Sequence, residues 1–218
     1  LDGTLLNSRQ EISDYTASVV NRLVERGMLF SYATARSSHT AFPIVKKLTV
    51  EIPVIVHNGA FILDSGTREI LSANFFRQED FQEIFQLLTG RQISPIVYAY
   101  IRGAEKFSYL PSQVNDETEQ FIRTRRGDSR ERPVAEFPEM CEGSPYYFTC
   151  IDTAEKLRPV YELLREKYAC VYQRDIYGGA QWLEIMPPGT SKANAILQLK
   201  KRLGVEKIVS FGDAKNDI

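Results

Sequence analysis

Apolar and polar residues alternate along the first third of the chain in a way that predicts strands and helices in turn. Apolar residues recur at helical spacing between Ser13, a residue type that caps helix N-termini, and Gly27, which ends the pattern. Shorter apolar runs bounded by turn residues predict strands. The expected elements are a strand over 28–33, a helix over 40–48, a strand over 53–56 and a hairpin over 60–71. Such alternation is typical of a parallel sheet covered by helices.

The middle of the chain has a different pattern and is long enough for a core of its own. Most of the 11 tyrosines lie between residues 77 and 186. We interpret this segment as an inserted domain, with residues 187–189 as the return linker. A helix over 191–203, ended by Gly204, then leads to an apolar run over 207–211 that predicts a buried parallel strand. Within the insert we expect helices over 79–88, 116–125 and 154–168, strands over 96–101, 146–151, 169–174 and 182–186, and a polar hairpin over 106–110.

Composition excludes some partners without identifying one. The 27 basic and 28 acidic residues leave a net charge of -1, so bulk charge does not predict binding to nucleic acid. Arginines between residues 123 and 132 are interleaved with acidic residues, which favours a solvated loop over a nucleic-acid contact. The longest uncharged apolar run, residues 95–101, is far shorter than the roughly 20 residues that a membrane span needs.

Cysteine and histidine usage favours a reducing compartment and gives no metal site. The 3 cysteines are odd in number and lack the spacing of metal ligands, so a cytoplasmic location is expected. His39 and His57 are the only histidines, and neither has a partner at metal-ligand spacing. Both are therefore expected at the surface.

The strongest chemical signal is the acidic turn that contains Asp213 and Asp217. It follows the apolar run over 207–211, and open α/β sheets bind ligands at such strand ends. Two like charges in one turn repel each other unless a cation or water separates them, and Gly212 lets the backbone bend closely. Carboxylates gathered in this way hold a hard cation such as Mg²⁺. Metal or phosphate chemistry is therefore favoured here over a pair of solvated turn residues.

Three other positions have both a structural and a chemical interpretation. Asp2 precedes a glycine, and Asp-Gly pairs are common in turns. Thr34 follows a predicted strand, so its hydroxyl either caps a helix or helps to bind an anion. Lys192 lies in the first turn of a helix, where the helix dipole disfavours a cation without an anionic partner, although a solvated lysine is equally consistent. Together with the acidic turn, these residues suit phosphoryl transfer, which requires groups that neutralise charge on phosphate oxygens.

These residues resemble the haloacid dehalogenase superfamily of phosphatases, and its Cof-like group in particular. The family's first motif, Asp-x-Asp-Gly-Thr-Leu-Leu, is similar to residues 1–6, so the sequence begins one residue after the expected nucleophile. The second motif, Thr-Gly-Arg, resembles residues 34–36 with alanine in place of glycine, and an Asn-Gly-Ala turn occupies residues 58–60. The third motif's lysine matches Lys192, and the fourth motif, Gly-Asp-x-x-Asn-Asp, matches residues 212–217.

The resemblance implies an α/β fold and a role for each matched residue. The fold would be a Rossmann-like parallel-sheet core with helices on both faces, formed by residues 1–76 and 187–218, plus an inserted α/β cap domain over 77–186. Strands and helices that follow the fourth motif in the family are absent, so the sequence is expected to be part of a longer chain. By the resemblance, the catalytic residues are Asp2 as general acid/base, Thr34 and Lys192; the phosphate-binding residues are Thr34, Ala35, Lys192 and Asn216; the cleft residues are Arg36, Asn58 and Gly59; and the metal ligands are Asp2 through its main-chain carbonyl, Asp213 and Asp217.

The expected activity is Mg²⁺-dependent hydrolysis of a phosphomonoester through an aspartyl-phosphate. Mg²⁺ is the expected cofactor and a small-molecule phosphate ester the expected partner, with neither nucleic acid nor membrane, and no oligomeric state is specified. Two alternatives stay open. One is a phosphosugar mutase on the same core, supported only by the basic residues at 123–132. The other is a non-catalytic protein that binds a phosphate ligand, which would follow if the residue before Leu1 is not aspartate.

Overall fold

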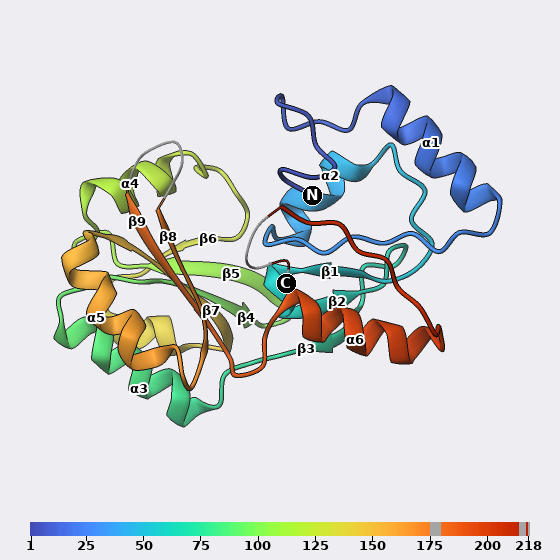
Figure 1. The fold of residues 1–218 in the computed structure, drawn as a ribbon. Helices are drawn as coiled ribbons and strands as arrows, with labels where there is room; N and C mark the ends of the chain where they lie inside the picture. The colour runs from blue at the N-terminus through green and yellow to red at the C-terminus, as the bar shows by residue number, and fades with distance from the viewer. Residues whose placement is uncertain (175–179, 214–216, 218) are drawn as a thin grey trace. The chain divides into compact units, whose positions relative to one another are not determined.

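The computed structural model describes residues 1–174, 180–213 and 217. The chain separates into two compact units, one formed by Leu1–Asn74 and Thr190–Ile218 and the other by Phe75–Gly189 (Figure 1). The inserted segment that the sequence predicts, 77–186, differs from the second unit by a few residues at each boundary. The α/β class predicted from the sequence is confirmed. No helix among the described residues is long and apolar enough to cross a membrane.

Two helices in the N-terminal part of the first unit begin at serine caps. Helix α1 spans Asp14–Glu25, and the predicted cap Ser13 accepts a hydrogen bond at its hydroxyl from the Thr16 N–H, 3.0 Å away. Helix α2 spans Ser38–Val45 and begins two residues before the predicted start, because Ser37 is its cap. Both caps satisfy N–H groups that the first turn of a helix leaves without partners.

The sheet of the first unit is small, three-stranded and antiparallel. Strand β2 (Phe61–Leu63) pairs with β3 (Ile70–Ala73), as the hairpin pattern predicts. Strand β1 (Val54–Val56) pairs antiparallel with β2, whereas the sequence predicts a strand of a parallel sheet there. Helix α6 (Lys192–Leu203) lies against this sheet, where Ala195 and Leu199 contact Ile55 and Ile62 in a shared apolar cluster. Figure 1 shows α1 and α2 on the other side of β1 from α6.

Two strands that the sequence predicts in this unit are not formed as ladders. Residues 28–33 contribute a single parallel bridge, between Ala33 and Ile55. Residues 207–211 form no strand, and Val209 and Phe211 are 79% and 83% exposed rather than buried. An apolar run predicts a strand only if a neighbouring strand supplies hydrogen-bond partners, and among the described residues 207–211 pairs with none.

The second unit is a six-stranded sheet in the order β6-β5-β4-β7-β9-β8. Its pairs are antiparallel except for β5 with β6. The predicted strands and helices are present, but the short β6 and a 3₁₀ turn over Phe137–Cys141 were not expected. The elements are α3 (Gln78–Gly90), β4 (Ile96–Ile101), β5 (Ala104–Tyr109), α4 (Asp116–Arg123), β6 (Glu131–Pro133), β7 (Ser144–Asp152), α5 (Ala154–Leu164), β8 (Ala169–Arg174) and β9 (Gln181–Met186).

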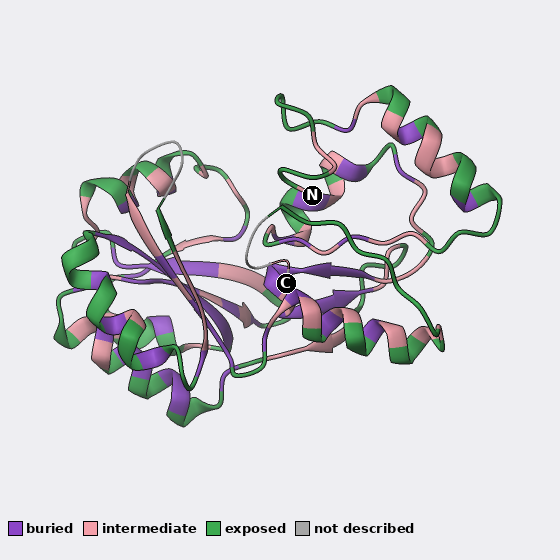
Figure 2. Ribbon diagram, in the orientation of Figure 1, coloured by how far each residue is buried: buried purple, intermediate pink, exposed green. Residues whose placement is uncertain are grey.

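The largest apolar core of the chain lies in this second unit. Side chains of α3 and α5 pack together with alternate residues of β4, β7 and β9 in one cluster (Figure 2). Phe81 stacks on Phe85 and Phe148, with ring centroids 5.6 and 5.0 Å apart. A smaller cluster joins α4 to β4 and β5 through Ile122, Ile96 and Phe107. The insert therefore has a core of its own, and aromatic pairs add to its stability beyond simple burial.

The solvated loop predicted for the arginines between residues 123 and 132 is only partly observed, because Arg123 and Arg126 are exposed whereas Arg125 and Arg130 are not. Arg130 is buried and forms ion pairs with Glu105 and Asp128, both at 2.7 Å. Arg125 lies over the Phe121 ring, 3.4 Å from its centroid. The interleaved acidic residues serve as buried partners instead of solvated neighbours, because β6 pairs with β5 and brings this segment against the sheet.

A buried carboxylate ties the start of α3 to the segment before β8. Asp80 is 2% exposed, and it accepts hydrogen bonds from Arg77 Nε at 2.7 Å and from the Tyr168 hydroxyl at 2.9 Å. Lys167 Nζ lies 3.2 Å from the same carboxylate. The hydrogen bond from Arg77 holds the pKa of Asp80 well below its ordinary value of 3.8, against the opposing effect of burial, with Tyr168 and Lys167 adding to the lowering.

Replacing Asp80 with asparagine removes the charge while keeping the shape of the side chain. We expect Asp80→Asn to lower the free energy of unfolding at pH 7 by about 1–3 kcal/mol, the usual cost of losing hydrogen bonds to a buried charged group. Because the folded pKa is depressed, this stabilisation is present above pH ~4 and is lost as the pH falls further toward the folded value. Urea unfolding followed by the fluorescence of Trp182, the single tryptophan, measures the effect.

Glu79→Gln is the matched control, because Glu79 is an exposed acidic residue in the same helical turn. A destabilisation by Asp80→Asn that equals the control, or that persists unchanged at pH 3, would contradict the proposed contribution of the buried charge.

Candidate functional site

The turn at Asp2, Gly3 and Thr4 packs directly against Asp213. Gly3 has a φ of +69°, and a Cβ atom added to it would lie 2.0 Å from a carboxylate oxygen of Asp213. The Thr4 hydroxyl donates to Asp213 Oδ1 at 3.0 Å. The carboxylate of Asp213 thus occupies space that only glycine leaves open. The first and last predicted motifs therefore meet, although 209 positions separate Thr4 from Asp213.

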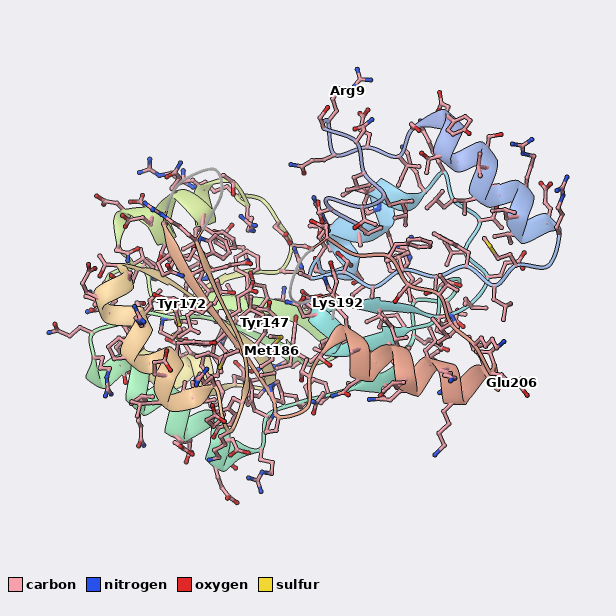
Figure 3. All side chains as sticks on the ribbon, in the orientation of Figure 1. Arg9, Tyr147, Tyr172, Met186, Lys192 and Glu206 are labelled. Atoms are coloured by element: carbon pink, nitrogen blue, oxygen red, sulfur yellow. The ribbon has the colours of Figure 1, made fainter. Side chains whose placement is uncertain are left out.

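Lys192 and Asp217 form a partly buried ion pair beside this turn. Ser191 caps α6 by accepting from the Asn194 N–H, and Lys192 follows in the first helical turn (Figure 3). Lys192 is 7% exposed, and its Nζ lies 2.7 Å from Asp217 Oδ1. The other oxygen of Asp217 accepts from the Asp213 N–H at 3.1 Å. Asp217 is the anionic partner that a lysine at a helix N-terminus requires.

Thr34 and Asn58 lie in adjacent turns that backbone hydrogen bonds hold together. The Thr34 N–H donates to the Ile55 carbonyl at 3.0 Å, and the Thr34 carbonyl accepts from the Asn58 N–H at 2.9 Å. The Thr34 hydroxyl accepts from the Arg36 N–H at 3.1 Å, which leaves its own hydrogen available to another acceptor. Thr34 and Asn58 are both buried, whereas Ala35, the residue after Thr34, is exposed.

Gly59 brings the Asn58 turn against the start of α6. Its φ is +96°, and a Cβ atom there would lie 2.2 Å from the Ser191 carbonyl oxygen. His57 precedes this turn and is buried, 5% exposed, so its expected position at the surface is wrong. The reason is local, since the His57 N–H donates to the Arg36 carbonyl and the ring packs edge-on against Phe61.

The carboxylate of Asp2 is held by Arg36. Arg36 Nε donates to one carboxylate oxygen at 2.9 Å and Nη2 to the other at 2.6 Å. These hydrogen bonds lower the pKa of Asp2 from its ordinary value, against the opposing effect of partial burial, and the positive charge of Arg36 adds to the lowering. Asp2 is therefore ionised at neutral pH in this arrangement. The predicted role of Arg36 in a substrate cleft stays a prediction.

Hydrogen bonds and one ion pair link residues from the two ends of the chain. Thr4, two residues after Asp2, donates to Asp213, the Asp213 N–H donates to Asp217, and Asp217 pairs with Lys192. The sequence places these residues at opposite ends of the chain, and the fold brings them to one point.

The oxygen atoms of the site suit a hard divalent cation. Among the residues that the structure describes, no three Asp, Glu, His or Cys side chains form a group that could hold a metal ion. The donors predicted from the sequence are the carboxylates of Asp213 and Asp217 and the main-chain carbonyl of Asp2, all of them hard oxygen ligands. Their assignment as metal ligands stays a prediction. Asn216, predicted to bind phosphate, lies outside the described residues.

Comparison with known proteins agrees with these motifs. A family model described as haloacid dehalogenase-like hydrolase matches residues 1–218. The chain belongs to the haloacid dehalogenase-like hydrolase family. Its relatives include the 5-amino-6-(5-phospho-D-ribitylamino)uracil phosphatase YwtE of Bacillus subtilis, 26% identical over 100% of this chain and 81% of the relative. The HMP-PP phosphatase of Serratia proteamaculans is 24% identical over 100% of this chain and 76% of its own length.

Solved structures of the haloacid dehalogenase-like family share the fold. An X-ray structure of a Thermotoga maritima protein matches with a TM-score of 0.74 and 25% identity, over 100% of this chain and 79% of that one. A haloacid dehalogenase-like hydrolase from Bacteroides thetaiotaomicron matches with a TM-score of 0.71 and 23% identity, over 94% and 75%. The family match covers the whole chain, and the relatives above are named phosphatases. This chain is therefore a phosphatase of the haloacid dehalogenase-like family.

Some residues of the site were not anticipated from the sequence. Thr4 was only part of a motif, yet its hydroxyl binds Asp213. Gln10 was not considered, yet its side-chain oxygen accepts from Arg36 Nη2 at 3.0 Å. Neither position has a local pattern that predicts these contacts, because both partners lie far away in the chain.

The contact between Gly59 and Ser191 gives a test of the site's packing. We expect Gly59→Ala to lower the free energy of unfolding by about 1–3 kcal/mol more than Gly27→Ala, because overpacking adds to backbone strain. Gly27 is the matched control, since its φ is +90° but an added Cβ would contact nothing within 4 Å. Chemical unfolding followed by circular dichroism measures both variants. Equal destabilisation by Gly59→Ala and Gly27→Ala would show that glycine is needed at position 59 only for its positive φ and not for the contact with Ser191.

Proposed function

We propose that this protein is a Mg²⁺-dependent phosphomonoester hydrolase that acts on a small phosphorylated metabolite through an aspartyl-phosphate. The observation that carries the proposal is the packing of the turn over residues 2–4 against Asp213, beside the ion pair of Asp217 with Lys192. In the family motif the residue before Leu1 is the aspartate nucleophile. A side chain attached there would lie among one cation and several hard oxygen donors, which is the environment that phosphoryl transfer requires.

The first step divides a difficult displacement into two easier ones. The carboxylate at the position before Leu1 forms a bond to phosphorus, and the bond from phosphorus to the ester oxygen breaks. Asp2 is ionised beside Arg36, so it first takes up a proton from solvent; it then gives that proton to the ester oxygen, which leaves as an alcohol. The product of this step is an aspartyl-phosphate. Asp2 suits this role because its carboxylate is exposed and adjacent to the same turn.

The second step regenerates the enzyme. Asp2, now a carboxylate, takes a proton from a water molecule as the water oxygen forms a bond to phosphorus. The bond from phosphorus to the aspartate oxygen breaks, which releases inorganic phosphate and restores both carboxyl groups. The lowered pKa of Asp2 beside Arg36 favours the base form that this step needs.

Four groups would hold the phosphoryl oxygens during both steps. The ammonium of Lys192 lies at the site, and the Thr34 hydroxyl has a hydrogen to donate. The exposed Ala35 N–H and the amide of Asn216 complete the predicted phosphate ligands. Mg²⁺, held by the carboxylates of Asp213 and Asp217 and the Asp2 carbonyl, supplies charge stabilisation for the phosphoryl oxygens when bound. The second unit, Phe75–Gly189, is assigned as the cap domain that excludes water from the reaction.

The names of the relatives support small phosphate esters as the substrate class. YwtE is named for a phosphorylated ribitylaminouracil, and the Serratia proteamaculans protein for HMP-PP. The phosphosugar mutase alternative rests on the basic residues at 123–132. Burial of Arg130 in ion pairs weakens this support, because a buried arginine is not available to a substrate phosphate. The non-catalytic alternative is decided by the residue that the gene encodes before Leu1, for which aspartate is expected.

The proposal is tested by phosphate release from a panel of metabolite phosphates. The full-length protein should release phosphate with Mg²⁺ and lose this activity with EDTA. Asp213→Asn should lower kcat/KM by at least about 100-fold, because a metal contributes several kcal/mol to such transition states.

Asp14→Asn is the control, since Asp14 is an exposed residue whose ion pair with Lys47 lies at the surface. Turnover that is indifferent to EDTA, or wild-type activity in Asp213→Asn, would contradict the metal site. Isomerisation of a phosphosugar without phosphate release would favour the mutase, and metabolite binding without turnover would favour the binding protein.

A further inference from the structure

We propose that Gln10 is a positioning residue for the phosphatase reaction, acting on Asp2 through Arg36. The inference rests on the proposed role of Asp2 as general acid/base and extends it. No substrate contact is assigned to Gln10. Its function is to restrict the guanidinium that holds the catalytic carboxylate.

Gln10 is presented by a short loop that Asn7 closes. The Asn7 side-chain oxygen accepts from the N–H groups of Arg9 and Glu11 at 2.9 and 3.1 Å. The backbones of Asn7 and Glu11 are also paired, with Asn7 N–H donating to the Glu11 carbonyl at 3.0 Å, and the Gln10 N–H donates to the Asn7 carbonyl at 2.9 Å. Gln10 has a φ of +59°, a left-handed conformation that is strained for a residue other than glycine. The hydrogen bonds of the loop maintain it.

Arg36 is held at both its backbone and its side chain. Its N–H donates to the Thr34 hydroxyl, and its carbonyl accepts from the His57 N–H. At the other end, Nη2 donates to Gln10 Oε1 at 3.0 Å and to Asp2 Oδ1 at 2.6 Å, while Nε donates to the second oxygen of Asp2 at 2.9 Å. One nitrogen of the guanidinium thus connects the loop to the carboxylate.

The hydrogen bond from Arg36 to Gln10 matters because the ion pair between Arg36 and Asp2 is not buried. The side chains of Arg36 and Asp2 are 25% and 51% exposed, and exposed ion pairs fix their partners only weakly. Two parallel hydrogen bonds orient a carboxylate with respect to the guanidinium plane, but they do not prevent the whole pair from moving. Gln10 restrains the guanidinium from the side opposite its backbone attachment. The carboxylate of Asp2 is thereby kept near one position, as an acid that must meet a leaving oxygen requires.

The chemistry provides a readout that a purely structural role would not change. A proton from Asp2 is needed when the leaving oxygen is a poor leaving group, as in an alkyl phosphate. It is hardly needed for p-nitrophenyl phosphate, whose leaving phenolate is stable without a proton. The ratio kcat/KM reports the first phosphoryl transfer, in which the leaving group departs. Loss of positioning should therefore lower kcat/KM for alkyl phosphates selectively.

The decisive experiment compares Gln10→Met, which keeps the length of the side chain but has no oxygen acceptor, with Gln10→Glu, which retains the acceptor. In the full-length protein, Gln10→Met should lower kcat/KM by about tenfold for an alkyl phosphate that the wild type hydrolyses, a part of the roughly 10²–10⁴ that general acid catalysis contributes. Its kcat/KM for p-nitrophenyl phosphate should change less than twofold, roughly within the scatter of such comparisons. Gln10→Glu should restore the alkyl phosphate rate.

Arg9→Ala is the control in the same loop. Arg9 lies at the outer tip of the loop in Figure 3, and its side chain is 82% exposed with only a 4.0 Å ion pair to Glu11. This variant should behave as the wild type toward both esters. Circular dichroism and thermal unfolding identify any variant that fails to fold. If Gln10→Met does not fold, Gln10→Ala, which also lacks the oxygen acceptor, takes its place with the same expected selective loss.

Equal losses for both esters in Gln10→Met, or no loss for either, would overturn the inference while leaving the phosphatase proposal intact. A selective loss that Gln10→Glu does not restore would also overturn it, because the acceptor atom would then be irrelevant. Wild-type protein that hydrolyses neither ester nor any metabolite phosphate would instead refute the proposed function itself. The two failures are therefore distinguishable.

Discussion

The ion pair between Lys192 and Asp217 is the interaction on which the arrangement of the site depends. A lysine in the first turn of a helix is unfavourable without an anion nearby, and a mostly buried ammonium is costly to leave unpaired. Asp217 satisfies Lys192 with one oxygen and the Asp213 N–H with the other. The acidic turn is thereby attached to α6. Without this attachment, the repulsion between two carboxylates in one turn would no longer be offset by the charge of Lys192.

Close packing at glycines makes the convergence possible. Gly3 leaves room for the Asp213 carboxylate, Gly212 for the Asp217 side chain, and Gly59 for the Ser191 carbonyl. At each position a Cβ atom would overlap a neighbour, so the absence of a side chain is what allows two segments to touch. These contacts lie beside the apolar cluster that packs α6 on the small sheet of the first unit.

The second unit depends on different interactions. Its six-stranded sheet and the aromatic cluster of α3, α5 and β7 bury a core that is independent of the site residues. Asp80 and Arg130 are charged residues inside this unit, and each is matched by oppositely charged partners. A domain with its own core can move as a body, which suits the cap role proposed for it. Specificity can then evolve in this unit while the phosphoryl-transfer residues stay unchanged.

Sequence alone determined the elements whose causes are local, and tertiary structure decided the contacts that are not. The Ser13 cap, the hairpin over 60–71 and the strands of the insert follow from residue types and spacing within a few positions, and the motif residues could be placed in turns. The strand expected over 207–211 was wrong, because an apolar run by itself supplies neither a pairing partner nor a surface that buries it. The contact of Asp2 with Arg36 crosses 34 positions and that of Thr4 with Asp213 crosses 209. Side-chain direction at such separations is set by the packing of whole segments, so only the folded chain shows that these groups meet.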